Sequence, residues 1–176
     1  MELGSAIGFL GLYCLKRLEV RRFASVEANP ETGRQLCSNY TINNITPEYY
    51  NIAISDHDGH TSFGISGDFW VHSIHQSTES SEQLHIPCKT LRSICLEISF
   101  QPTVIVIDIE GSENLIAFSE VPPTVRLLII ELHPLILSPR VTHQIIQQIM
   151  NLGFLVIETS HNTFCFERSA LSANCN

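Results

Sequence analysis

Aliphatic runs without alternating polar positions are the clearest feature of the hydrophobic pattern. Val104 to Ile107 is aliphatic throughout, and the predicted strand Val125 to Ile130 ends in four aliphatic residues. Strands of this kind are typical of a parallel sheet that helices cover on both faces. We therefore expect these two strands to be buried on both faces, at the centre of the domain.

Helix and strand patterns alternate along the rest of the chain. Thr90 is a suitable N-cap, Ser138-Pro139 fits the start of a helix, and Gly153 fits its end. This order predicts an α/β fold with a Rossmann-like, doubly wound sheet that a terminal hairpin closes. The predicted helices are 8–17, 30–38, 91–97, 112–118 and 138–152, the other predicted strands are 22–26, 50–55, 61–65, 69–74, 154–158 and 163–168, and 77–83 is a polar loop.

Acidic residues stand where three of the apolar strands should end. The chain opens Glu2-Leu3-Gly4-Ser5-Ala6-Ile7-Gly8, Glu27 follows the second strand, and Asp108 with Glu110 follows Val104 to Ile107. Glycines after a short strand allow close approach of the backbone to a ligand. An acid about 20 residues further on can accept hydrogen bonds from both ribose hydroxyls of a nucleoside. The pattern predicts a nucleoside-containing cofactor at one edge of the sheet.

The cofactor is not expected to be a dinucleotide. That fingerprint is G-x-G-x-x-G, and here Ala6 occupies the place of the middle glycine. Glu2 adds a negative charge where a pyrophosphate would be repelled. The spacing E-x-G-x-x-x-G resembles motif I of the S-adenosylmethionine-dependent methyltransferases, whose cofactor carries an ammonium and a sulfonium. The alternative for these small residues is an ordinary turn at the start of a helix.

The ordered set of motifs resembles the FkbM family of S-adenosylmethionine-dependent methyltransferases. The resemblance covers nearly the whole chain and ends near Arg168, which gives one methyltransferase domain over 1–168. Residues 169–176, after the last predicted strand, are expected to form a disordered tail. It implies a mostly parallel seven-stranded sheet with the last strand antiparallel, and methyl transfer to a hydroxyl of a small molecule such as a sugar or polyketide. The segments that carry it are Glu2 to Gly8, Val26 to Pro30, Asn51 to Gly59, Ile86 to Leu91, Val106 to Glu113, and Glu131 to Pro134.

The resemblance also implies roles for individual residues. The first loop would line the methionine half of the cofactor, Glu27 with Ala28 and Asn29 would hold the ribose, and Asp56 would lie near the adenine. Asp108 and Glu110 would face the methionine moiety or the acceptor. The residues of the first loop in this set are Glu2, Gly4, Ser5, Ala6 and Gly8. Without the resemblance, Glu27 is a possible helix N-cap and Asp56 a turn residue.

A base is useful when the methyl acceptor is an alcohol, because the hydroxyl proton must leave. Glu131 and His133 end the fifth strand of the predicted sheet, on the edge where such sheets bind ligands. We therefore predict that His133, or a carboxylate among Asp108, Glu110 and Glu131, accepts the proton. The alternative is that His133 and Pro134 only shape a turn.

Composition excludes several other classes. The 176 residues carry a net charge of −8 with only 10 Lys and Arg, so a nucleic acid is not expected as a partner. The six cysteines form no C-x-x-C pair, and we expect reduced thiols in a cytoplasmic protein that contacts no membrane. His72 and His75 point to opposite faces of a predicted strand, so no metal site is expected. Phe69 and Trp70 are assigned to the core of a predicted hairpin, with a wall of the acceptor pocket as the alternative.

Two other function classes stay open. Family members usually carry residues before motif I, whereas Met1 directly precedes Glu2 here. This departure is compatible with a fragment of a family member or with a short-start variant. It is also compatible with a non-catalytic domain that binds cofactor or a protein partner, and a homodimer is one such assembly. A nucleotide-dependent oxidoreductase is the third class, and the missing G-x-G-x-x-G argues against it.

Overall fold

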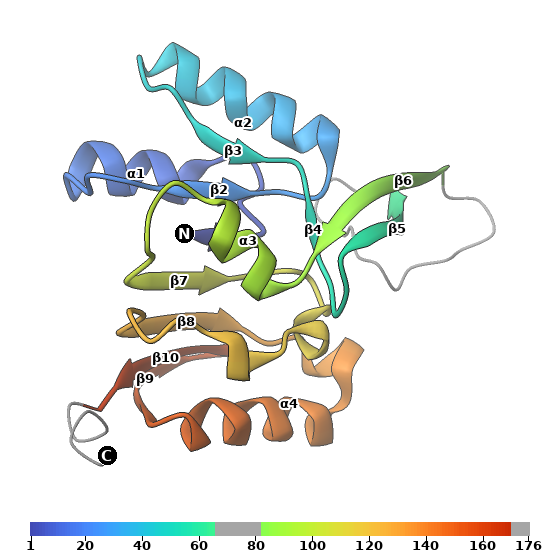
Figure 1. Ribbon diagram of the computed structural model, residues 1–176, viewed down its shortest axis with the longest axis vertical. Helices are drawn as coiled ribbons and strands as arrows, with labels where there is room; N and C mark the ends of the chain where they lie inside the picture. The colour runs from blue at the N-terminus through green and yellow to red at the C-terminus, as the bar shows by residue number, and fades with distance from the viewer. Residues whose placement is uncertain (66–81, 170–176) are drawn as a thin grey trace.

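The computed structural model describes residues 1–65 and 82–169. Seven strands form one sheet in the order β3-β2-β1-β7-β8-β10-β9, and β10 runs antiparallel to both of its neighbours, β8 and β9 (Figure 1). This is the predicted α/β sheet with its last strand antiparallel. The strands of the sheet are β1 (Glu2–Leu3), β2 (Ala24–Val26), β3 (Glu48–Tyr50), β7 (Val104–Ile107), β8 (Leu127–Glu131), β9 (Phe154–Ser160) and β10 (Thr163–Arg168).

Local signals explain where the helices begin and end. Asn29 accepts hydrogen bonds from Glu31 N and Thr32 N at the start of α2, and Thr90 accepts one from Ser93 N at the start of α3. Gly153, at a φ of 84°, follows the end of α4 as predicted. The helices are α1 (Phe9–Arg17), α2 (Pro30–Ile42), α3 (Leu91–Glu97) and α4 (Pro134–Asn151).

Three predicted elements differ from the structure. The strand predicted over 50–55 is broken into β3 and β4 (Ala53–Ile54), which belong to different sheets. The helix predicted over 112–118 is two 3₁₀ turns, Glu113–Leu115 and Phe118–Glu120. Helix α4 begins earlier than predicted, at Pro134, but the backbone of Ser138 is non-helical (φ 70°, ψ 151°), so a second helical segment starts after this kink, at Pro139, as predicted.

A second sheet lies beside the carboxyl ends of the parallel strands (Figure 1). It has the order β4-β6-β5, with β5 over Gly59–Ile65 and β6 over Glu82–Lys89. The polar loop was predicted over 77–83, but Glu82 and Gln83 already belong to β6. The predicted end of the loop is therefore wrong. The predicted strand 69–74, with Trp70 and His72, lies outside the described residues, as do His75 and residues 170–176 of the predicted tail.

The main core lies on one face of the sheet. Ile105 and Ile107 of β7 and Leu128 and Ile130 of β8 are fully buried, together with apolar residues of α3 and α4. The alternate positions, Val104, Val106, Leu127 and Ile129, are half-buried or exposed. The expectation of burial on both faces is thus wrong for the described part of the chain.

The partly exposed positions of β7 and β8 lie on the same face of the sheet as the residues of β2 that α2 covers. Val106 is opposite Glu2, Glu2 is opposite Ser25, and Ser25 lies 3.1 Å from Tyr40 of α2. Helix α2 thus covers this face at β2, but no helix among residues 1–65 and 82–169 buries it at β7 and β8 to the same degree. None of the helices in the described part of the chain combines the length and apolar character that a membrane-spanning segment needs.

Candidate active site

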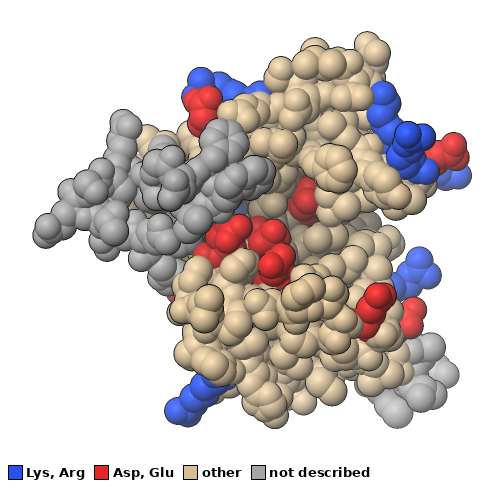
Figure 2. All heavy atoms as spheres, turned by 180° about the vertical axis from the view of Figure 1, so that it is seen from behind, with Lys and Arg blue, Asp and Glu red and all other residues tan. Residues whose placement is uncertain are grey.

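The register of the parallel strands brings the predicted site residues into one row. Leu3 is opposite Val26 on one side and Ile107 on the other, and Ile107 is opposite Ile130. The next residues along these strands are Gly4, Glu27, Asp108 and Glu131. Four predicted site residues thus follow neighbouring strands at the same edge, where open α/β sheets bind ligands. Figure 2 shows acidic side chains gathered in a hollow of the molecule.

The loop after β1 packs tightly against its neighbours. Gly4 N and Ser5 N both donate to Val26 O, at 2.9 and 3.0 Å. Gly4 has a φ of 84°, and a Cβ there would lie 1.6 Å from Asp108 O. A Cβ at Gly8 would lie 2.6 Å from the Tyr40 ring. Atoms of the protein itself therefore explain both glycines, whereas the sequence-based interpretation attributed them to the close approach of a ligand.

Glu27 holds two loops together. Its Oε2 accepts from Ala6 N and its Oε1 from Asn29 N, both at 2.8 Å. Asn51 Nδ2 donates to Glu27 O and Ala28 O, both at 2.9 Å, and so braces the same loop from the end of β3. Burial raises the pKa of the Glu27 carboxyl, and the bonds from Asn29 and Ala6 oppose that shift. The N-cap of α2 is Asn29, so the alternative that Glu27 only caps this helix is wrong.

Glu2 is a buried carboxyl without a full set of partners. It is 7% exposed, and its Oε2 has no hydrogen-bond partner among the described residues. Burial raises the pKa of Glu2 to about 7. A buried carboxylate of this kind costs the folded state free energy unless a cation or a hydrogen-bond donor satisfies it. Glu2 therefore favours a ligand with a cationic group.

His133 lies among three carboxylates. Its Nδ1 is 2.8 Å from Glu113 Oε1, and its Nε2 is 3.3 Å from Glu110 Oε2 and 3.8 Å from Asp108 Oδ1. Glu113 is completely buried and also accepts from Gly111 N at 3.0 Å. Glu110 has a φ of 51°, so the turn after β7 is sharp. Sequence analysis did not assign a role to Glu113, because its partner lies 20 residues away in the chain.

These contacts set the protonation of the group. Bonds to Glu110 and Glu113 raise the pKa of His133 to about 10, although burial opposes the shift. Burial, and then the charge of Glu110, raises the pKa of Asp108 to about 6. His133 is thus an imidazolium at neutral pH and holds a proton rather than accepting one. Its role as a catalytic residue remains a prediction, and the proton-accepting role moves to a carboxylate.

We expect His133 to remain protonated at pH 8 in the protein free of metal ions. The raised pKa means that its contacts stabilise the fold fully below about pH 6.5 and lose this effect as pH rises through about 10. Imidazole ¹⁵N chemical shifts, followed from pH 5 to 11, measure this directly. The Glu110→Gln variant should move the midpoint of the His133 titration toward 6.5, because the contact with Glu110 is the largest cause of the raised pKa. A midpoint near pH 6.5 for His133 in the wild-type protein would contradict the raised pKa.

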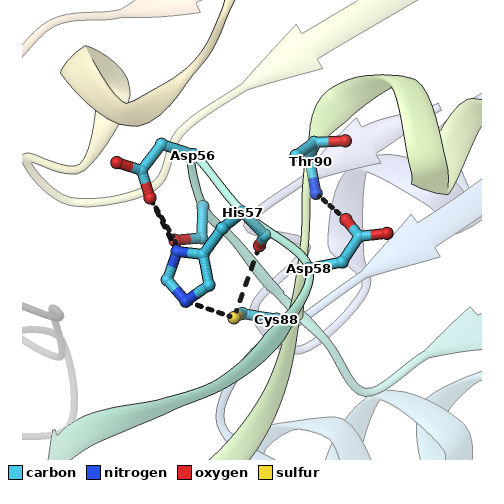
Figure 3. A network of polar contacts seen from close by, with 6 residues as sticks. Asp56, His57, Asp58, Cys88 and Thr90 are labelled. Atoms are coloured by element: carbon cyan, nitrogen blue, oxygen red, sulfur yellow. Dashed lines mark hydrogen bonds and ion pairs between the residues drawn. The ribbon is translucent and has the colours of Figure 1, made fainter.

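Asp56 belongs to a separate polar network in the turn between β4 and β5. Its Oδ1 lies 2.7 Å from His57 Nδ1, and His57 Nε2 lies 3.7 Å from Cys88 Sγ (Figure 3). The order Cys, His, Asp is that of an activated thiol nucleophile. Cys88 is only 1% exposed, however, and burial raises its pKa, so the thiol stays protonated and donates to His57 O.

The same turn is fixed to α3. Asp58 accepts from Thr90 N at 2.9 Å (Figure 3). It also accepts from Ser93 Oγ at 2.7 Å. These bonds give the Asp56 network a structural role. No hydrogen bond or ion pair within the described segments links Asp56 to Glu27 or to the loop after β1, so its adenine contact remains a prediction.

Comparisons with known proteins support the fold. No protein-family model matches the chain, and no curated protein sequence matches it either. Among solved structures, the chain is similar to a ribosomal protein L11 methylase from Lactobacillus delbrueckii subsp. bulgaricus. The TM-score is 0.55 at 11% identity, over 96% of this chain and 69% of the other. With the strand order above, this shows the Rossmann-like fold of the class I methyltransferases.

Proposed function

We propose that this chain is an S-adenosylmethionine-dependent methyltransferase that binds its cofactor over the ends of β1 and β2. The observation that carries the proposal is the placement of Glu27, whose carboxylate lies beside the loop after β1 and is held by Ala6 N and Asn29 N. A carboxylate has about four acceptor positions, so it can accept the ribose hydroxyls in addition. The likeness to an L11 methylase supports the same reaction class.

Charge supports this cofactor over a dinucleotide. Glu2, Glu27 and Asp108 lie at one edge of the sheet, and none forms an ion pair with a Lys or Arg of the described segments. Burial raises the pKa of each of the three. The ammonium and sulfonium of S-adenosylmethionine would relieve this excess of negative charge, whereas a pyrophosphate would increase it. Glu2 and Asp108 would face the methionine half.

The chemistry requires alignment and one proton acceptor. Methyl transfer breaks the sulfur–methyl bond as the acceptor oxygen bonds to the methyl carbon, and the hydroxyl proton must leave. Alignment alone can supply about 7–11 kcal/mol of the barrier. Among the predicted bases, Asp108 and Glu110 both lie near His133 Nε2, whereas Glu131 forms no described ion pair. We therefore assign the proton to Glu131 in this proposal, with a hydroxyl of a small molecule as the acceptor.

Glu27→Ala should weaken S-adenosylmethionine binding by about 10- to 100-fold, because hydrogen bonds to a charged group contribute roughly 1.5–3 kcal/mol. Calorimetric titration of S-adenosylmethionine and S-adenosylhomocysteine measures this loss. Glu31→Ala is the matched control, since Glu31 is an exposed acid on α2 that pairs with Arg34. The proposal fails if folded wild-type protein binds neither compound, or if both variants bind as the wild type does.

The exposed apolar face favours a second candidate function. Val104 and Leu155 are 37% and 55% exposed, on the face of the sheet that α2 covers only at its other end. A domain that binds cofactor and docks a protein partner there, such as a second copy of the chain, would bury these residues. Cofactor binding without turnover on a panel of hydroxyl acceptors would support this candidate.

A further inference from the structure

We propose that Asp108, Glu110 and His133 form a binding site for one divalent metal ion. Each residue offers one ligand atom, and these atoms lie within 4.8 Å of one another. Two of the ligands come from the turn after β7 and the third from the end of β8, so adjacent parallel strands build the site. The proposal departs from the sequence-based expectation of no metal site, which considered only His72 and His75.

The spacing of the ligand atoms suits a small ion. In octahedral coordination with bonds of about 2.1 Å, neighbouring ligand atoms are roughly 3 Å apart. His133 Nε2 lies 3.3 Å from Glu110 Oε2 and 3.8 Å from Asp108 Oδ1. These two distances exceed that value by a few tenths of an ångström to about 0.8 Å, and all three atoms lie within 4.8 Å of one another, so small side-chain movements would bring them around one ion. The ion would replace the Nε2 proton, which leaves to solvent.

Buried oxygen atoms without partners point independently to a cationic ligand. Asp108 Oδ1, one of the three ligand atoms, is shielded from solvent and accepts no hydrogen bond from the described residues. Glu113 is 0% exposed and contacts His133, and its Oε2 also lacks a partner in this part of the chain. Oxygen atoms left in this state cost the fold free energy until a donor or a cation reaches them.

Glu113 also supplies the support that metal-bound histidines usually have. Its Oε1 lies 2.8 Å from His133 Nδ1, which leaves Nε2 facing Asp108 and Glu110. A carboxylate behind a histidine fixes the ring orientation and makes the other nitrogen a better ligand. The buried position of Glu113 holds this arrangement rigid.

The donor set indicates the kind of ion. Two carboxylate oxygens suit Mg²⁺, Ca²⁺ and Mn²⁺, and the imidazole nitrogen favours a transition metal. Mn²⁺ satisfies both requirements, and three protein ligands leave coordination positions open. A catalytic role for the ion rests on the proposed function. In that role, the open coordination positions would hold oxygen atoms of the methyl acceptor beside the cofactor. The ion itself should bind with or without methyl transfer.

Titration of Mn²⁺ into protein treated with EDTA and dialysed tests the proposal, with calorimetry and the EPR signal of free Mn²⁺ as readouts. We expect one Mn²⁺ per chain and weaker binding of Ca²⁺. Asp108→Asn, Glu110→Gln and His133→Ala should each weaken Mn²⁺ binding at least tenfold. Glu113→Gln should weaken it by about 10- to 100-fold through the orientation of His133.

The control is Glu158→Gln, an exposed acid on β9, which should bind Mn²⁺ as the wild type does. Thermal unfolding identifies any variant that does not fold, and the half-buried Glu110 then gives the decisive comparison. No binding at millimolar Mn²⁺ by folded wild-type protein would overturn the proposal, as would wild-type affinity in folded Glu110→Gln. Titration of S-adenosylmethionine in EDTA reports the cofactor site separately, so the two proposals fail independently.

Discussion

Replacing Gly4 with alanine is expected to lower the free energy of unfolding by roughly 2–5 kcal/mol. Gly4 has a φ of 84°, and an L residue in this region costs about 1–2 kcal/mol. The added Cβ would lie 1.6 Å from Asp108 O and 2.7 Å from Asp108 C. Both are backbone atoms, so relief requires the loop after β1 to move away from the end of β7.

Urea unfolding with the calorimetric melting temperature measures this loss. Gly59→Ala is the control, because Gly59 also has a positive φ but its Cβ would come no closer than 3.7 Å to His57. The control places an alanine at another positive φ without a close backbone contact, so we expect a clearly larger loss of stability in Gly4→Ala than in Gly59→Ala. Equal stability of Gly4→Ala and the wild type would mean that β1 and β7 do not meet as described.

Replacing Glu2 with glutamine is expected to raise the free energy of unfolding by about 3 kcal/mol at pH 8, with little change at pH 4. The pKa of Glu2 is about 7 in the folded chain, against 4.5 for the ordinary group. The folded state therefore binds more protons than the unfolded state between these values. Wild-type stability falls as pH rises through this window, whereas glutamine does not titrate.

Urea unfolding of both proteins at pH 4, 6 and 8 measures the pH dependence of this difference. Glu31→Gln should stay within about 0.5 kcal/mol of the wild type, as exposed substitutions usually do. We also expect Glu2→Gln to bind S-adenosylmethionine less tightly. The negative charge of Glu2 destabilises the fold when it is buried alone, but in the proposed complex it attracts the cationic cofactor. A Glu2→Gln protein no more stable than the wild type at pH 8 would contradict the assigned burial.

The sequence predicted what depends on local signals. Thr90 and Gly153 act at the helix ends as their chemistry indicates, and β9 and β10 form the predicted hairpin. The mostly parallel seven-stranded sheet with an antiparallel last strand was implied by the resemblance to a methyltransferase family. The row of acids at the strand ends followed from the same reasoning, because the carboxyl ends of parallel strands meet at one edge.

The sequence did not predict what depends on packing between distant segments. The aliphatic pattern of β7 and β8 indicates burial but not which helices are present to cover each face. The pairing of His133 with Glu113 joins a helix start to a 3₁₀ turn, and no spacing rule connects the two. The raised pKa of His133 follows from its contacts with Glu110 and Glu113, and no spacing in the sequence indicates them.

A crystal structure of the chain with S-adenosylhomocysteine tests the central claim most directly. The account predicts the nucleoside beside the loop after β1, with both ribose hydroxyls within hydrogen-bond distance of Glu27. The amino-acid half should point toward Glu2 and Asp108. Density for the compound elsewhere on the molecule, or a Glu27 carboxylate that contacts only Ala6 N and Asn29 N in crystals saturated with it, would contradict the account.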